Sequence, residues 1–213
     1  MKSIVVLISG SGSNLQAIMD QVHSTDVPGK IVAVISNKPD AYGLQRAQKV
    51  DIPTHVFEHQ KAESRLAFDK EMMAKIDQYQ PDLIVLAGFM RILSDEFVNH
   101  YMGRLINIHP SLLPDFKGLH THRRALEAKV QYHGASVHFV TPTLDDGPVI
   151  LQGKVAVEAN DSEESLQKKV HVQEHIIYPQ AVKWFCEDNL IMLNGKAYLD
   201  NKELDIAGNP IPD

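Results

Sequence analysis

The sequence predicts an α/β fold in which helices flank a mostly parallel sheet, with an antiparallel extension in the C-terminal half. Apolar runs typical of buried strands alternate with amphipathic helical segments through the first half of the 213 residues. In the second half, two strand-like runs are separated by a turn too short for a crossover helix, so we expect them to pair antiparallel. At 44% apolar residues the chain can build a full core, and we expect one Rossmann-like domain over residues 1–213.

The first half supplies the parallel strands. Strands are predicted at 3–9, 31–36, 54–57, 83–88 and 104–109, and helices at 15–22, 41–50 and 61–79. Ligands of such sheets bind beyond the carboxyl ends of the strands. We therefore expect residues 10–14, 88–92 and 107–109 to lie along one rim of the sheet.

The second half has a different character. The runs 135–140 and 149–152 are predicted to form the antiparallel pair. A long helix is predicted over 162–185, interrupted around Pro179 because proline cannot donate a helical hydrogen bond. Asn194-Gly195 lies between two short apolar runs and predicts a hairpin.

Composition excludes several classes of function. The net charge is −6 and there is no block of Lys and Arg, so nucleic acid is not an expected partner. No apolar run approaches the roughly 20 residues that cross a bilayer, and the N-terminus indicates a strand rather than a signal peptide. The single cysteine, Cys186, is expected to be a buried apolar residue, and its solitude fits a reducing cytoplasm.

The loop Gly10-Ser11-Gly12-Ser13-Asn14 follows the first strand and opens a helix. It lacks the third glycine and the distant acidic residue of a dinucleotide site, and it lacks the Gly-Lys-Ser/Thr of a P-loop. Two interpretations remain open. The loop could cradle one phosphate on its backbone amides, or it could be a tight turn with ordinary capping by Ser13 or Asn14.

The stretch His171-Val172-Gln173-Glu174-His175 matches a zinc-peptidase pattern, but no third protein ligand accompanies it, and we expect no metal. Glu174 falls inside the apolar stripe of its helix and must therefore be paired or bonded. A structural ion pair and a contact to a ligand both satisfy that requirement. His120-Thr121-His122 is predicted to be a polar loop rather than a metal site.

The strongest pattern is Asn107-Ile108-His109-Pro110. The strand period of two places Asn107 and His109 on the same side at the carboxyl end of a strand. Two hydrogen-bond donors at that place can stabilise an oxyanion, which indicates acyl transfer. No nucleophile elbow is present, so the acyl group is expected to pass directly to an acceptor. Asp145, in the turn between the antiparallel strands, could orient His109 and favour its protonated form, although Asp-Asp-Gly is also common turn chemistry.

Taken together, these motifs resemble the folate-dependent glycinamide ribonucleotide transformylase family of purine synthesis. The resemblance extends from Ile-Ser-Gly-Ser-Gly-Ser-Asn-Leu through Ala-Gly-Phe-Met-Arg-Ile-Leu, Asn-Ile-His-Pro-Ser-Leu-Leu-Pro and Asp-x-Gly-Pro-Val-Ile to Gln-Glu-His-Ile-Ile-Tyr-Pro. It implies the formyltransferase fold, with a nucleotide-binding half over about 1–100 and a folate and catalytic half over about 101–213. The segment Asp115-Phe116-Lys117 departs from the residue order that related enzymes often carry.

The resemblance also implies roles for individual residues. Asn107, His109 and Asp145 would be the catalytic group. The phosphate of glycinamide ribonucleotide would lie on Gly12, Ser13 and Asn14, and Glu174 would contact this acceptor. Arg65 would meet the benzoylglutamate end of 10-formyltetrahydrofolate, the formyl donor. The pterin ring would be enclosed by Met90, Arg91, Ile92, Leu93, Asn107, Thr141, Pro142, Thr143, Leu144 and Asp145.

Two other folate enzymes share the catalytic motif. A 10-formyltetrahydrofolate hydrolase is the main alternative, but it usually carries a regulatory domain for which 213 residues leave no room. A methionyl-tRNA formyltransferase should have a basic C-terminal domain, which this sequence lacks. We expect small-molecule substrates and a monomer or homodimer.

Overall fold

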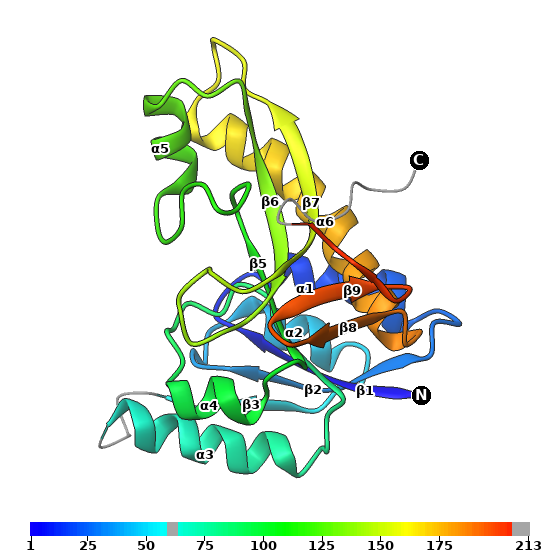
Figure 1. Ribbon diagram of the computed structural model, residues 1–213. Helices are drawn as coiled ribbons and strands as arrows, with labels where there is room; N and C mark the ends of the chain where they lie inside the picture. The colour runs from blue at the N-terminus through cyan, green and yellow to red at the C-terminus, as the bar shows by residue number, and fades with distance from the viewer. Residues whose placement is uncertain (59–63, 206–213) are drawn as a thin grey trace.

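The computed structural model describes residues 1–58 and 64–205, and it is built around a seven-stranded sheet in the order β3-β2-β1-β4-β5-β6-β7 (Figure 1). The parallel strands are β1 (Lys2–Ile8), β2 (Gly29–Ser36), β3 (Thr54–Val56), β4 (Leu83–Leu86) and β5 (Leu105–His109). The strands β6 (Tyr132–Phe139) and β7 (Val149–Ala156) continue the sheet antiparallel. The predicted α/β fold and its antiparallel extension are both confirmed.

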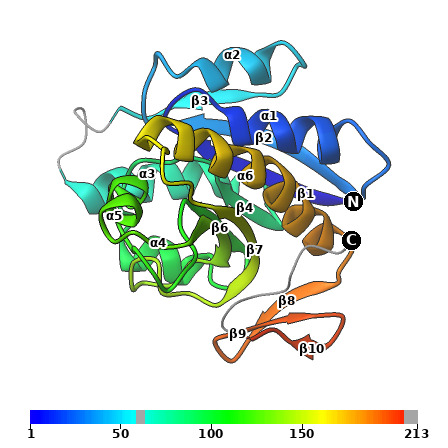
Figure 2. The same cartoon turned by 90° about the horizontal axis from the view of Figure 1, so that it is seen from above.

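Helices cover both faces of the sheet (Figures 1 and 2). They are α1 (Ser13–Ile18), continued by a π-helical turn at Met19–His23, then α2 (Tyr42–Gln48), α3 (Arg65–Asp77), α4 (Asp95–His100), α5 (Thr121–Glu127) and α6 (Glu163–Cys186). Alternate side chains of β1 enter two separate cores. Ile4 and Val6 pack with α1, α2 and α6, whereas Val5 and Leu7 pack with α3 and α4.

Two helices, α4 and α5, were not predicted, and the start of the helix predicted at 61–79 lies outside the described residues. The helices α4 and α5 have six and seven residues, too few to show a clear helical period. The helix predicted at 61–79 begins within the undescribed segment 59–63, and its described part ends at Asp77. The predicted hairpin is confirmed as β8 (Leu190–Leu193) and β9 (Lys196–Leu199), which form a small sheet with β10 (Lys202–Glu203).

The prediction that the last helix breaks at Pro179 is wrong. The helix α6 runs for 24 residues with Pro179 in its interior. Proline leaves the carbonyl four residues earlier without its helical donor. Here that carbonyl belongs to His175, and the side-chain amide of Gln21 donates to it at 2.9 Å. A side chain from the neighbouring helical segment thus replaces the missing hydrogen bond.

Tyr178, the residue before Pro179, ties α6 to the centre of the sheet. It is fully buried, and its hydroxyl lies 2.9 Å from the carbonyl oxygen of Leu86 and 3.2 Å from that of Ile106. The carbonyl of Leu86 lies at the end of β4, and Ile106 directly precedes Asn107 in the neighbouring strand β5. Glu174, one turn earlier in α6, therefore lies near the carboxyl rim of the sheet, where ligands of this architecture bind.

Cys186 is a free thiol and is buried, as the sequence predicted. Burial raises its pKa to about 12, so the thiol stays neutral. Within residues 1–58 and 64–205, no helix combines the length and the apolar character needed to cross a membrane.

Candidate functional site

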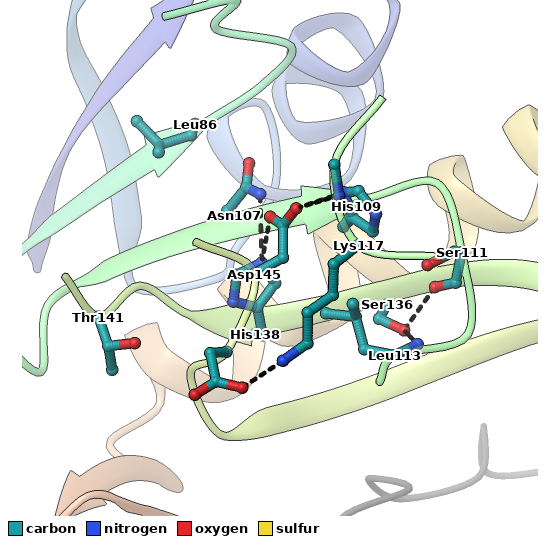
Figure 3. Close-up of polar contacts among 12 residues, drawn as sticks. Leu86, Asn107, His109, Ser111, Leu113, Lys117, Ser136, His138, Thr141 and Asp145 are labelled. Carbon is teal, nitrogen blue, oxygen red and sulfur yellow. Dashed lines mark hydrogen bonds and ion pairs between the residues drawn. The ribbon is translucent and has the colours of Figure 1, made fainter. Parts of the chain in front are cut away.

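The fold brings Asn107, His109 and Asp145 together at the end of β5 (Figure 3). Asn107 and His109 lie two residues apart on the same strand, and the turn between β6 and β7 carries Asp145 to them. The turn can close because position 147 is glycine: a Cβ there would lie 1.8 Å from the carbonyl oxygen of Phe139. The predicted grouping of the three side chains thus follows from strand pairing and one tight turn.

Both ring nitrogens of His109 face acceptors. Its Nδ1 lies 3.4 Å from Oδ2 of Asp145, and its Nε2 lies 3.0 Å from the carbonyl oxygen of Phe116. Both His109 and Asp145 are buried. A neutral imidazole can donate from only one nitrogen, so the doubly protonated ring is the form that satisfies both acceptors.

His138 is a site residue that the sequence did not single out. It is buried on β6 beside Asn107, and burial lowers its pKa to about 4, so it is neutral near pH 7. Its Nδ1 lies 2.9 Å from the carbonyl of Phe139 and must carry the proton. The bare Nε2 then accepts from the side-chain amide of Asn107 at 3.2 Å. This contact fixes the orientation of that amide and leaves its second N–H available.

Residues 110–118 form a loop that contacts the catalytic group through Phe116 and Gly118, and Figure 3 shows Lys117 of this loop beside Asp145. Its first part is anchored by Ser136, whose hydroxyl donates to the carbonyl of Ser111 and accepts from the amide of Leu113. Its last part is held by Asp145, which accepts from the amide of Gly118 at 2.9 Å, and by an ion pair between Lys117 and Asp146. The unusual Asp115-Phe116-Lys117 segment therefore contacts the site through its backbone.

The loop Gly10–Asn14 ends β1 and opens α1 without side-chain capping. Gly12 adopts the left-handed conformation, with φ of 71°, and within the described part of the chain no side-chain hydrogen bond caps the start of the helix. Asn14 instead donates to Oε2 of Glu174 at 2.8 Å, across 160 residues of sequence. Ordinary capping by Ser13 or Asn14 is therefore not what this loop does.

Of the two interpretations that the sequence left open for Glu174, the structural ion pair is not found among the described residues. Glu174 is 5% exposed, and its hydrogen-bond partner there is the uncharged side chain of Asn14. Burial raises the pKa of Glu174, and the Asn14 bond offsets only part of that effect. The Oδ1 atom of Asn14 is also buried and has no hydrogen-bond partner among the described residues. Unsatisfied polar groups of this kind are typical of a ligand site.

The raised pKa of Glu174 leads to a stability prediction. Folding penalises the ionised carboxyl, so the wild-type protein loses stability as the pH rises from the ordinary value of 4.5 through the raised one. Glu174→Gln keeps the shape and the acceptor for Asn14 but cannot ionise. We expect this variant to be more stable than the wild type at pH 8, with a difference that shrinks toward pH 5. Denaturant unfolding at several pH values tests this, and a difference that grows on acidification would contradict it.

Gly12 allows a second stability prediction. A Cβ at this position would lie 2.6 Å from the Cα of Gly43, and the left-handed backbone costs a non-glycine residue about 1 to 2 kcal/mol. Together with the overpacking, Gly12→Ala should lower the free energy of unfolding by about 2 to 4 kcal/mol. Gly10→Ala is the matched control in the same loop, because nothing lies within 4 Å of its Cβ. Equal unfolding midpoints for the two variants would refute the argument.

The segment Met90–Leu93 leaves the sheet beside Asn107, since Leu86 and Asn107 are paired in β4 and β5. The amide of Met90 donates to the hydroxyl of Ser9 at 2.8 Å. Arg91 lies over the ring of Phe68, and its buried Nε has no partner among the described residues.

Apolar side chains are exposed both on this segment and on residues 141–145. Met90 is 72% exposed, Ile92 60% and Leu144 53%. Arg65 is exposed at the start of α3, and the described contacts do not connect it with the other predicted residues.

The histidines of the two motifs at 171–175 and 120–122 do not form a group of metal ligands with other described residues. His171 and His175 stack with ring centroids 6.3 Å apart, and the described residues contain no group of three or more metal-binding side chains. The prediction of a polar loop at 120–122 is wrong, because α5 begins at Thr121 and buries His122. His122 Nδ1 lies 3.2 Å from Nε2 of His133, and burial lowers the pKa of both rings, so neutral histidines pack there.

Comparison with known proteins agrees with this geometry. A family model described as formyl transferase matches residues 2–182. A phosphoribosylglycinamide formyltransferase of Escherichia coli is 55% identical over 206 residues, 97% of each chain, and one of Haemophilus influenzae is 47% identical over 98% of each chain. The solved structure of a phosphoribosylglycinamide formyltransferase from Coxiella burnetii is 51% identical, covers 99% of both chains and has a TM-score of 0.94. The chain therefore belongs to the formyl transferase family, and within that family to the group of the phosphoribosylglycinamide formyltransferases.

Proposed function

We propose that this protein transfers the formyl group of 10-formyltetrahydrofolate to the amino group of glycinamide ribonucleotide, giving formylglycinamide ribonucleotide and tetrahydrofolate. The observation that carries the proposal is the group at the end of β5 that joins half-buried Asn107 to the buried pair of His109 and Asp145. It combines two hydrogen-bond donors with a carboxylate at the place where the fold binds ligands. This group stabilises charge that develops in a transition state.

The amine of the acceptor attacks the formyl carbon of the donor, and the carbonyl oxygen becomes an oxyanion. Asn107 donates to that oxyanion with the N–H that His138 does not use. The protonated ring of His109 is the second donor, and Asp145 stabilises its charge. Holding the two substrates in register supplies a further large part of the rate.

Proton transfer completes the reaction, because the attacking amine loses a proton and the departing folate nitrogen gains one. His109 is placed to relay it, directly or through a bound water. Its Nε2–H is engaged with the carbonyl of Phe116. The loop 110–118 must release this hydrogen bond before His109 can donate from Nε2 to a substrate.

The acceptor lies between the loop Gly10–Asn14 and Glu174 of α6. Its phosphate rests on the uncapped amides at Gly12, Ser13 and Asn14. The polar body of the acceptor meets Glu174 and the unpartnered Oδ1 of Asn14. A hydroxyl or ammonium group can donate to the carboxylate of Glu174 and to the Oδ1 atom of Asn14.

The donor lies between residues 90–93 and 141–145, beside the catalytic group. The exposed apolar side chains at 90–93 and 141–145 enclose the flat pterin ring, with Asn107 and Asp145 at its reactive end. Arg65, exposed at the start of α3, meets the anionic benzoylglutamate end.

The proposal is tested by consumption of 10-formyltetrahydrofolate with and without glycinamide ribonucleotide, beside a His109→Ala control. We expect turnover that requires the ribonucleotide and is lost in the control. Turnover without an acceptor would identify a 10-formyltetrahydrofolate hydrolase that uses the same group. The absence of turnover in both conditions would reject the proposal.

A further inference from the structure

Arg46 holds the loop Gly10–Asn14 from the neighbouring helix α2. Its Nε donates to the carbonyl oxygen of Ser11 at 2.9 Å, and its Nη1 donates to the side chain of Gln16 at 3.1 Å. Its guanidinium lies 4.9 Å from the ring centroid of Tyr42. Three contacts therefore fix a positive charge beside this loop, and none of them neutralises it.

The fold requires this proximity. A Cβ on Gly12 would lie 2.6 Å from Gly43, so the loop and the first turn of α2 are in backbone contact. The amide of Gly43 also donates to the carbonyl of Gly10 at 3.1 Å. Arg46 follows Gly43 by three residues and so lies on the same side of the helix, over the loop.

An anion at this loop needs such a charge. The protein has a net charge of −6, so its overall field repels a phosphate. The helix α1 has only six residues, and its amides supply partial charges. In residues 1–58 and 64–205, Arg46 is the only lysine or arginine with a hydrogen bond or ion pair to residues 10–16, and its Nη2 has no acceptor there.

We propose that Arg46 is a binding residue for the phosphate of the acceptor nucleotide, an assignment that rests on the proposed function. A guanidinium donates to phosphate oxygens through charge-assisted hydrogen bonds. Arg46 thus adds the full charge that the backbone amides lack. Its contacts with Ser11 and Gln16 also order the loop before the nucleotide arrives.

The test compares Arg46→Gln, Arg46→Lys and Lys49→Gln with the wild type. Glutamine can still donate to Ser11 but carries no charge, and Lys49 is the control cation over the same Tyr42 ring. Arg46→Gln should raise KM for glycinamide ribonucleotide by about 10- to 100-fold and leave kcat and the KM of the folate unchanged. Arg46→Lys should recover part of this loss, and Lys49→Gln should match the wild type.

A second acceptor separates a charge effect from a structural one. The riboside that lacks the phosphate should have the same KM in the wild type and in Arg46→Gln. An equal loss with both acceptors, or no loss with the ribonucleotide, would overturn the assignment. Calorimetric titration with ribose 5-phosphate gives a readout besides activity: weaker binding to Arg46→Gln supports the assignment even if the wild type transfers no formyl group, and equal binding overturns it.

Discussion

Asp145→Asn is expected to lower kcat by about a thousandfold or more while leaving both KM values nearly unchanged. The substitution removes the charge of this side chain but keeps the hydrogen bond that it accepts from Gly118. Gly118 donates to Oδ2 of Asp145, so the asparagine keeps its oxygen there and places its amide toward His138. The geometry is preserved, but the negative charge that stabilises protonated His109 is lost. Steady-state kinetics with both substrates measure the effect.

The neighbouring residue supplies the control. Asp146 lies in the same turn, but it is exposed and pairs with Lys117 rather than with His109. Exposed ion pairs contribute little, so Asp146→Asn should change kcat by no more than about twofold. A kcat for Asp145→Asn that equals that of the control would remove Asp145 from the catalytic group.

Asn107→Ala is expected to lower kcat by about 100- to 1000-fold, because one of the two oxyanion donors is removed. The KM of each substrate should change far less, since the donor acts in the transition state. The unfolding temperature provides the check on folding, because the variant also leaves Nε2 of His138 without its donor. A large rise in KM with an unchanged kcat would assign Asn107 to substrate binding alone.

A variant that carries both substitutions tests whether Asn107 and Asp145 act together. Asn107 and Asp145 are proposed to act on the same oxyanion, one directly and one through His109. Residues that act as a unit have effects that do not multiply. We therefore expect the Asn107→Ala, Asp145→Asn double variant to be much more active than the product of the two single effects predicts. Fully multiplicative losses would mean that the two side chains act independently.

The elements that the sequence predicted are those with strong local patterns. The continuous apolar runs of β1, β2 and β4 indicate strands buried on both faces, and Asn194-Gly195 indicates a hairpin. The short helices α4 and α5 carry too few residues for a period. The intact helix at Pro179 depends on Gln21, which lies far away in the sequence, so no local rule could predict it.

The site shows the same division. Asn107 and His109 stand two residues apart on one strand, which a period-two pattern makes visible. A single buried histidine such as His138 gives no such signal, and its importance follows only from the pairing of β5 with β6. Arg46 is also invisible in the sequence, because the contact between Gly12 and Gly43 places it. Strand pairing places His138 in the site and backbone packing places Arg46 there, and the spacing of residues in the sequence shows neither.

In the proposed reaction, the formyl group passes directly from the folate to the amine of the nucleotide. A carbon label in the formyl group of 10-formyltetrahydrofolate, followed during one turnover with glycinamide ribonucleotide, tests this transfer. We predict that all of the label that leaves the donor appears in formylglycinamide ribonucleotide, and that the intact mass of the protein does not change at any time. Label in free formate, or a protein heavier by one formyl group, would show that the transfer is not direct.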